Sequence, residues 1–188
     1  MEINKPTPAC KEDKDYIKYI DDHRKNVFIA FNRFGQQICL CLSLIGIPYK
    51  QLRNLVAVHD ISKYEPAEFS SYRQFFYPEQ GQEKDDDIFK KAWRHHYQHN
   101  RHHWQYWIEN GIPKPMDKLA VAEMVLDWIA MSIQNKTNPV NWYKQNKNQI
   151  QIDKQTRESV EKILDSLAAT REYPFSIHRY RPGQRKKP

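Results

Sequence analysis

Apolar residues recur at steps of three and four along almost the whole chain, and this period constrains the fold more than any other feature. The first stripe marks one predicted helix that can continue to Leu44, before Gly46 and Pro48 end it. Its members are Tyr16, Ile20, His23, Val27, Phe31 and Phe34. Because His23 belongs to this stripe, we expect its side chain to point into the protein.

Shorter helical segments follow, separated by proline, glycine and acidic residues. Helices are predicted near residues 48–63, 67–76, 88–107, from 117 onward, 139–146 and 153–169. No segment shows the apolar and polar alternation of a half-buried strand. The sequence therefore predicts an all-α protein, a single-domain helical bundle of about six or seven helices.

Length and charge favour one domain with two polar ends. The chain has 188 residues and 39% of them are hydrophobic, which suffices for a single core. We expect an N-terminal extension (1–13), a helical domain (14–172) and a basic C-terminal tail (173–188). The net charge is +7, but five positive residues follow the last acid, Glu172, so the domain itself is close to neutral. Nucleic-acid contact is therefore expected only through the tail.

Cysteine usage and hydropathy indicate the cytoplasm. Of the three cysteines, Cys39 and Cys41 lie inside an apolar run, which argues against a disulfide framework. No N-terminal segment has the pattern of a signal peptide, and the longest apolar run, residues 38–47, is too short to span a bilayer. We expect no membrane partner.

Seven of the eight histidines fall in three places: His23 alone, His59 beside Asp60, and five between His95 and His103. Imidazole is the commonest protein metal ligand. The clustering therefore predicts a metal centre.

The phase of the predicted histidine helix selects ligands within the cluster. At about 100° per residue, His96 and His103 fall inside or beside the apolar sector, whereas His95, His99 and His102 form a neighbouring stripe that faces a cleft or solvent. His96 and His103 are the preferred ligands. If the helix breaks at Asn100, then His95 or His102 can replace them.

A carboxylate stands on the apolar face of the helix that begins at Asp117. Asp127 shares that face with Ala120 and Met124, and Glu123 lies one turn before it. An inward carboxylate needs a partner. Asp127 is therefore a further candidate ligand, and Glu123 is a candidate acceptor for the second nitrogen of a ligating histidine.

In chain order these residues resemble the HD superfamily of metal-dependent phosphohydrolases, whose fold is an all-helical bundle. That signature is a lone His, a His-Asp doublet and a distant Asp, matched here over about residues 14 to 135 by His23, His59 with Asp60, and Asp127. The pieces HDISK, AWRHHYQHNRHHWQYW and EMVLDW are also similar to an uncharacterised HD-like family of bacteria and phages. That closer family has no established activity.

The resemblance implies a two-metal site. Its first ion would be held by His23, His59, Asp60 and Asp127, and Asp60 would bridge to a second ion held by His96 and His103. The cofactor that the resemblance implies is a divalent transition metal, with two ions of Mn, Fe, Co, Ni or Zn in the site.

The resemblance also assigns a phosphate contact. Lys63 stands where phosphodiesterases with a His-Asp-x-Gly-Lys motif keep a lysine near the phosphate, with Ser62 in place of the glycine. The Gly-Tyr-Pro element of cyclic-di-nucleotide phosphodiesterases and the Glu-Asp pair of alarmone hydrolases are lacking, which disfavours both activities.

The expected function is a phosphohydrolase acting on a nucleotide or other small phosphate ester through a metal-activated water. Asp60 and Lys63 would be catalytic, and Lys63, His95 and His102 would contact the substrate. Two alternatives remain: a non-enzymatic nucleic-acid-binding protein that uses the basic tail, and an HD-type di-iron oxygenase. The sequence specifies neither the substrate nor the metal, nor the oligomeric state.

Overall fold

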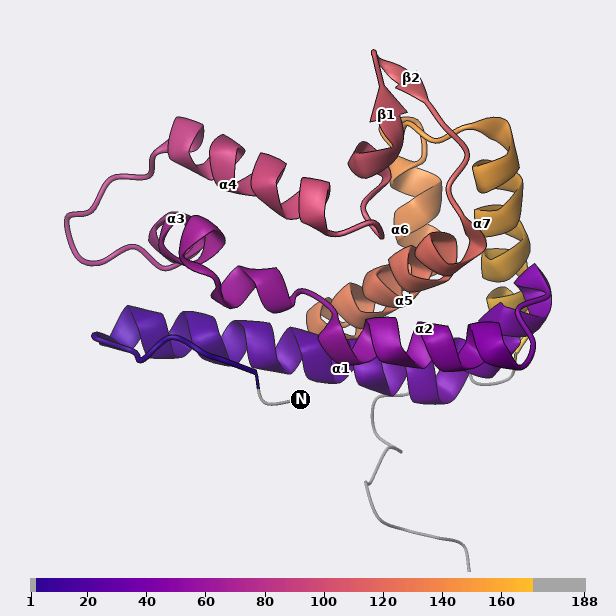
Figure 1. The fold of residues 1–188 in the computed structure, drawn as a ribbon, viewed down its shortest axis with the longest axis horizontal. Helices are drawn as coiled ribbons and strands as arrows, with labels where there is room; N and C mark the ends of the chain where they lie inside the picture. The colour runs from indigo at the N-terminus through magenta and orange to yellow at the C-terminus, as the bar shows by residue number, and fades with distance from the viewer. Residues whose placement is uncertain (1–2, 171–188) are drawn as a thin grey trace, which may run out of the picture.

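The computed structural model describes residues 3–170, and seven α-helices carry the fold of this part of the chain (Figure 1). They are α1 (Lys11–Leu42), α2 (Ile47–Val58), α3 (Pro66–Phe76), α4 (Asp86–His99), α5 (Lys118–Asn135), α6 (Pro139–Asn146) and α7 (Lys154–Ala168). Two 3₁₀ helices, η1 (Ile61–Tyr64) and η2 (Trp104–Trp107), link them. The predicted all-α class is confirmed.

The only strands in residues 3–170 form a small hairpin that the sequence did not predict. β1 (Ile108–Glu109) pairs antiparallel with β2 (Ile112–Pro113), and Asn110 and Gly111 between them both have positive φ. Such a turn suits an Asn-Gly pair. Each strand has only two residues, which is too few for the alternating pattern on which strand prediction depends.

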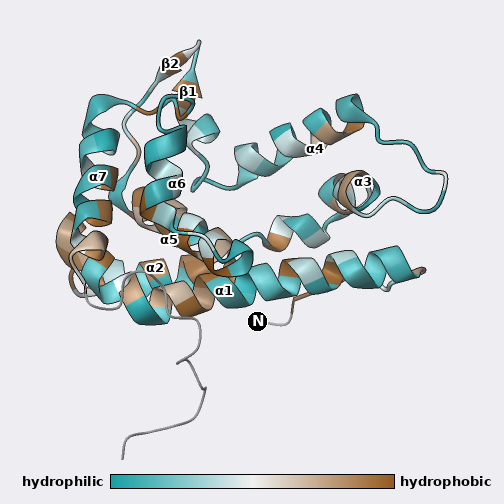
Figure 2. Ribbon diagram, turned by 180° about the vertical axis from the view of Figure 1, so that it is seen from behind, coloured by the Kyte–Doolittle hydropathy of each residue, from teal (hydrophilic) through white to brown (hydrophobic). Residues whose placement is uncertain are grey.

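The larger apolar cluster forms where α1 packs along α5, with α7 beside them. Ile38 of α1, Ile129 of α5 and Ile163 of α7 are all fully buried in it. Figure 2 shows hydrophobic residues along α5 and along the part of α1 that it crosses. Burial of these faces supplies the main driving force for packing the bundle.

A second apolar cluster lies where α3 and α4 pack over the first half of α1. Its buried members are Tyr16, Ile20, Tyr64, Phe69, Tyr72 and Ala92. Ile20 belongs to this cluster and Val27 belongs to the larger one, so His23 stands on α1 at the junction between them. The junction is where the other candidate ligands meet.

Two predicted helix ends are wrong, and both corrections fall beside the candidate site. α2 ends at Val58 and not at Lys63, because the backbone leaves the helical region at His59 (ψ 130°) and Asp60 then adopts the left-handed conformation, with φ 55° and ψ 22°. α4 ends at His99 and does not reach Trp107, because Asn100 is extended and its side-chain amide donates to the His96 carbonyl and to Ser62 Oγ. Asparagine side chains compete with helix continuation in this way.

The other boundaries agree closely with the prediction. α1 begins three residues before the domain start expected at residue 14, and α5 begins directly after Asp117, whose carboxylate accepts the N–H of Ala120 at 2.9 Å. Among residues 3–170 no helix is both long and apolar enough to cross a membrane.

Shortening a side chain in the α1–α5 interface should destabilise the protein. Ile129 is completely buried, so Ile129→Ala leaves a cavity and should lower the free energy of unfolding by about 2–5 kcal/mol. Leu40, on α1 and 61% exposed, is the matched control: Leu40→Ala should change the free energy by less than about 0.5 kcal/mol. Urea unfolding followed by circular dichroism measures both, and equal effects would contradict the packing described.

Candidate metal centre

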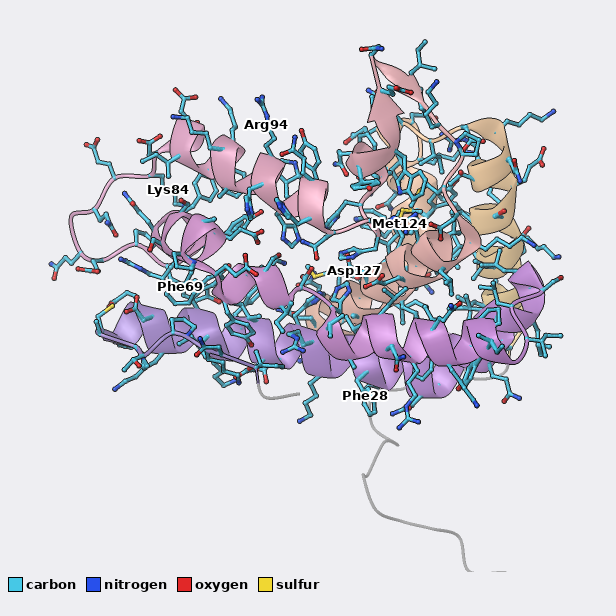
Figure 3. All side chains as sticks on the ribbon, in the orientation of Figure 1. Phe28, Phe69, Lys84, Arg94, Met124 and Asp127 are labelled. Carbon is cyan, nitrogen blue, oxygen red and sulfur yellow. The ribbon has the colours of Figure 1, made fainter. Side chains whose placement is uncertain are left out.

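The candidate ligands come from four separate parts of the fold. His23 lies on α1, His59 and Asp60 follow α2, and Asp127 extends from α5 toward the middle of the molecule (Figure 3). The remaining candidates belong to α4 and the segment after it, and are His96, His102 and His103. Residues from 23 to 127 along the chain therefore meet at one place.

Arg24 ties the His59–Asp60 turn to α1. Its Nε donates to the His59 carbonyl at 2.8 Å, and its Nη2 donates to the Ala57 carbonyl at 2.8 Å. Carbonyls at a helix C-terminus lack partners within the helix and favour cations. The residue that follows His23 thus fixes the backbone that presents the other ligands.

One group of ligand-type atoms surrounds the His23 imidazole. His23 Nε2 lies 3.1 Å from Asp127 Oδ1, 3.5 Å from Asp60 Oδ2 and 3.4 Å from His59 Nε2. His23, His59 and Asp60 are each at most 2% exposed. Two imidazoles and two carboxylates therefore converge here.

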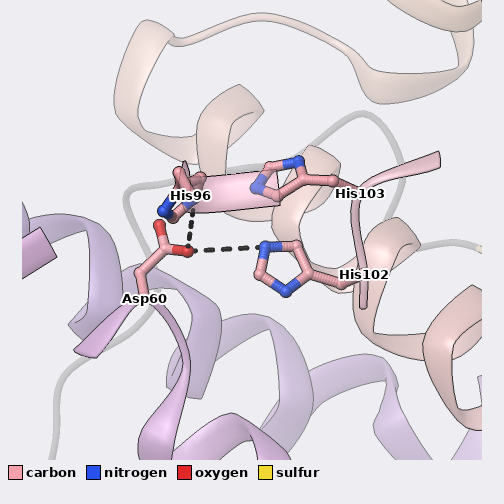
Figure 4. A group of neighbouring side chains, drawn as sticks. All are labelled: Asp60, His96, His102 and His103. Atoms are coloured by element: carbon pink, nitrogen blue, oxygen red, sulfur yellow. Dashed lines mark ion pairs between the residues drawn. The ribbon is translucent and has the colours of Figure 1, made fainter. Parts of the chain in front are cut away.

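A second group lies on the other oxygen of Asp60 (Figure 4). Asp60 Oδ1 is 3.3 Å from His96 Nε2 and 3.4 Å from His102 Nε2. Together with His103, each residue of this group offers one ligand atom, and the four atoms lie within 4.8 Å of one another.

The ligand atoms of the second group are buried without hydrogen bonds. This holds for Asp60 Oδ1 and for Nε2 of His96, His102 and His103. An unpaired buried polar atom costs about 1–3 kcal/mol. Four such atoms facing one point fit a bound cation, and buried His/Asp groups of this kind could hold metal ions.

Two glutamates hold the outer nitrogens of the imidazoles. Glu123 Oε1 lies 2.9 Å from His59 Nδ1 and 3.4 Å from His102 Nδ1. Glu68, completely buried, lies 2.8 Å from Nδ1 of both His95 and His96. A carboxylate that accepts from Nδ1–H leaves the Nε2 lone pair free to bind a metal.

The carboxylates of the centre are ionised. Burial alone would raise the pKa of Asp60, but Lys63 and the neighbouring imidazoles hold it well below its usual range. In the same way, His23 outweighs burial and lowers the pKa of Asp127, and hydrogen bonds from His102 and His59 lower that of Glu123 to about 2. Glu68 has a lowered pKa because His96 and His95 outweigh its burial.

Lys63 and His102 are cations that pair with these carboxylates. Lys63 Nζ lies 2.7 Å from Asp60 Oδ2, and that pairing raises the lysine pKa against the effect of burial. Burial lowers the pKa of His59 and of His103, which keeps both neutral. For His102, Asp60 and Glu123 outweigh burial and raise the pKa to about 10. Four ionised carboxylates therefore share this buried site with Lys63 and His102, and a metal ion would be a further cation for them to pair with.

The structure brings all six predicted metal ligands together: His23, His59, Asp60, His96, His103 and Asp127. Their binding of metal stays a prediction. Glu123 has the geometry expected of it, as acceptor for His59. Lys63, predicted to contact phosphate, pairs with Asp60 and keeps 19% of its side chain exposed.

In the predicted outer stripe, His95 and His99 lie as expected and His102 does not. The helix breaks at Asn100, which is the alternative under which His102 could replace a preferred ligand. Because α4 stops at His99, His102 turns inward and is 2% exposed, whereas His99 is exposed and His95 is half-buried against Glu68. Sequence reasoning also missed Glu68 as a histidine partner. A signal existed, since Glu68 shares a helix face with Tyr72 one turn later, just as Glu123 shares one with Asp127.

A groove of about 880 Å³ reaches the cluster from the side of the outer nitrogens. It runs between α2 and the start of α5, and its lining includes His59, His102 and Glu123 but not Asp60 or Asp127. Small molecules in this groove can therefore approach the glutamate side of the imidazoles.

Fold and site together thus define an all-α protein with a buried cluster of histidines and carboxylates. The chain matches, over residues 12–166, the family described as "Family of unknown function (DUF5662)", and it belongs to that family. The match contains every candidate ligand. No curated protein and no solved structure matches the chain.

Removing either glutamate should weaken metal binding while the ligands stay in place. Glu123→Gln and Glu68→Gln each replace a charged acceptor of an imidazole Nδ1–H, and each should lower metal affinity about 10–100-fold. Glu158→Gln, on the exposed face of α7, is the control and should have no effect. Calorimetric titration of the metal-free variants with Zn²⁺ or Mn²⁺ is the measurement. Unchanged affinity in both glutamate variants would contradict the role of these carboxylates as partners of metal-binding imidazoles.

Proposed function

We propose that the protein is a metal-dependent phosphohydrolase of the HD superfamily, acting on a nucleotide or another small phosphate ester. The observation that carries the proposal is the position of the Asp60 carboxylate. Its Oδ2 lies 3.5 Å from His23 Nε2, and its Oδ1 lies 3.3 Å from His96 Nε2, 3.4 Å from His102 Nε2 and 3.7 Å from His59 Nε2, so one carboxylate reaches both groups of ligand atoms. A bridging carboxylate in a two-metal site requires such an arrangement.

The ligand types suit two divalent transition metals. His23, His59, Asp60 and Asp127 would hold one ion, and Asp60, His96 and His103 would hold the other. Imidazole and carboxylate donors fit Mn, Fe, Co, Ni or Zn. When bound, two such ions supply hydroxide near neutral pH and stabilise the oxygens of an in-line displacement at phosphorus.

The chain's own cations and histidines complete the reaction. Lys63, fixed by Asp60 and partly exposed, would neutralise negative charge that develops on the phosphate. His95 is half-buried, with its Nδ1 2.8 Å from Glu68 Oε1, and in its protonated form it would donate its Nε2–H to the leaving group. His102, the other residue expected to contact substrate, is surrounded by atoms that can bind a metal.

The two alternative functions differ in what supports them. The basic tail invoked for nucleic-acid binding, residues 173–188, lies outside the described residues. Trp93, an aromatic residue of a type that can stack on bases, is packed against His96 and His103. A di-iron oxygenase would use the same histidines and carboxylates, and oxygen consumption without phosphate release would select it.

Loss of the shared carboxylate should remove both metal and activity. The wild-type protein should contain about two transition-metal ions and release phosphate from some nucleotide in a panel supplemented with Mn²⁺ or Co²⁺. Asp60→Ala should lose ions and phosphate release together, since both ligand groups depend on Asp60. Metal analysis by mass spectrometry and a phosphate assay measure this. An Asp60→Ala protein with full metal content and activity would falsify the proposal.

Loss of the lysine should separate catalysis from metal binding. Lys63→Gln removes the positive charge next to the Asp60 carboxylate and should lower kcat about 10²–10³-fold while metal content stays complete. Lys90→Gln, an exposed lysine on α4, is the control and should behave like the wild type. If Lys63→Gln keeps full kcat, the lysine only balances the charge of Asp60.

A further inference from the structure

We propose that the two subsites of this centre are unequal, because His102 joins His96 and His103 to make a subsite of three imidazoles and one carboxylate. This second subsite binds zinc, or another late transition metal, more tightly than the first subsite, which consists of His23, His59, Asp60 and Asp127. The centre then holds two different metals. The inference rests on the metal centre of the proposed function and is independent of the phosphate chemistry.

Two distances from Asp60 Oδ1 match the spacing of ligands in tetrahedral coordination. Zinc–nitrogen bonds of about 2.0–2.1 Å place two tetrahedral ligands about 3.3–3.4 Å apart. Asp60 Oδ1 is 3.3 Å from His96 Nε2 and 3.4 Å from His102 Nε2. These separations are long for a hydrogen bond and right for two ligands of one ion.

The backbone explains how two consecutive histidines can serve one ion. On a continuous helix, His102 and His103 would point about 100° apart. α4 stops before them, His103 has an extended backbone, and their ring centroids lie 4.2 Å apart. The end of α4 at Asn100 therefore creates a third imidazole for this subsite.

Glutamates prepare two of the three imidazoles as ligands. Glu68 holds Nδ1 of His96 and Glu123 lies near Nδ1 of His102, so Nε2 of each ring is directed toward Asp60. Nε2 of both rings, and of His103, has no hydrogen bond. Three imidazoles are one of the ligand sets with which zinc enzymes hold Zn²⁺.

The first subsite differs in both donors and pairing. It offers His23 and His59 with the carboxylates of Asp60 and Asp127, and His23 Nε2 already lies 3.1 Å from Asp127 Oδ1. Oxygen-rich sites suit Mn²⁺, and affinity at nitrogen-rich sites rises from Mn²⁺ toward the later metals. Zinc should therefore fill the three-imidazole subsite first.

His102 also lies within reach of the other subsite. With His59 and Asp127 it forms a further group whose ligand atoms are within 4.8 Å of one another. Two observations place His102 in the second subsite. Its Nε2 lies 3.4 Å from Asp60 Oδ1, and it is one of the four unpaired atoms of that group. The experiment below distinguishes the two placements.

The test is made on metal-free, full-length protein with one equivalent of Zn²⁺. X-ray absorption at the zinc edge should show three imidazoles around the ion, and Mn²⁺ added afterwards should bind with a stoichiometry of one by electron paramagnetic resonance. Two imidazoles around the first zinc, or displacement of that zinc by Mn²⁺, would overturn the inference. This measurement uses the wild-type chain, so no variant has to fold.

Two variants then assign the subsites, with folding checked by circular dichroism. His102→Ala should weaken binding of the first equivalent of Zn²⁺. The loss of affinity should exceed the ~10–100-fold that follows removal of a hydrogen-bonded partner of a ligand. Asp127→Asn should leave the affinity for this equivalent of Zn²⁺ unchanged and weaken the binding of Mn²⁺. The reverse pattern places His102 in the first subsite and overturns the inference, while the proposed function stands. If neither metal binds the wild-type protein, the inference and the proposed function fail together.

Discussion

The accumulation of negative charge at one buried junction is the constraint on which the rest of the site depends. Asp60, Asp127, Glu68 and Glu123 are ionised there, and Lys63 is the amine that contacts one of them directly. Ionised groups removed from water are very costly unless they are paired. The imidazoles partly satisfy this requirement, and a bound cation would complete it.

This charged junction lies between the two apolar clusters of the fold. α1 contributes to both clusters, and His23 lies on α1 between Ile20 of one and Val27 of the other. Helix α1 therefore does more than supply a ligand. Through Arg24 it also holds the end of α2, so that the His59–Asp60 turn is connected to the helix that carries His23. Water exclusion around these residues strengthens every charge interaction among them.

How much the sequence could predict follows from the range of each interaction. The positions of α1, α3, α5 and α6 depend on local periodicity and capping, and the predicted and observed boundaries nearly coincide. Asp60 and Asn100 are different, because their backbone conformations depend on contacts with distant parts of the chain. Asn100 donates to Ser62, 38 residues away, and no periodicity reports such a contact.

The same contact explains why the ligand set was only partly predicted. His23, Asp127 and His96 stand on regular helices, where the apolar stripe shows which way a side chain points. His102 lies beyond a break whose place the residue type suggested but whose geometry it did not give. The helical phase therefore assigned His102 to the outer stripe, and the structure has it 2% exposed.

The departures from ordinary local rules gather at this one site. Asp60 is a non-glycine residue with positive φ, Glu68 is a completely buried acid, and several imidazole nitrogens have no hydrogen bond. Each of these costs free energy that packing elsewhere must offset. A chain that follows local preferences along α1, α5 and α7 but violates them around Asp60 has the pattern expected where function competes with stability. That concentration, more than the number of histidines, argues for chemistry at the junction.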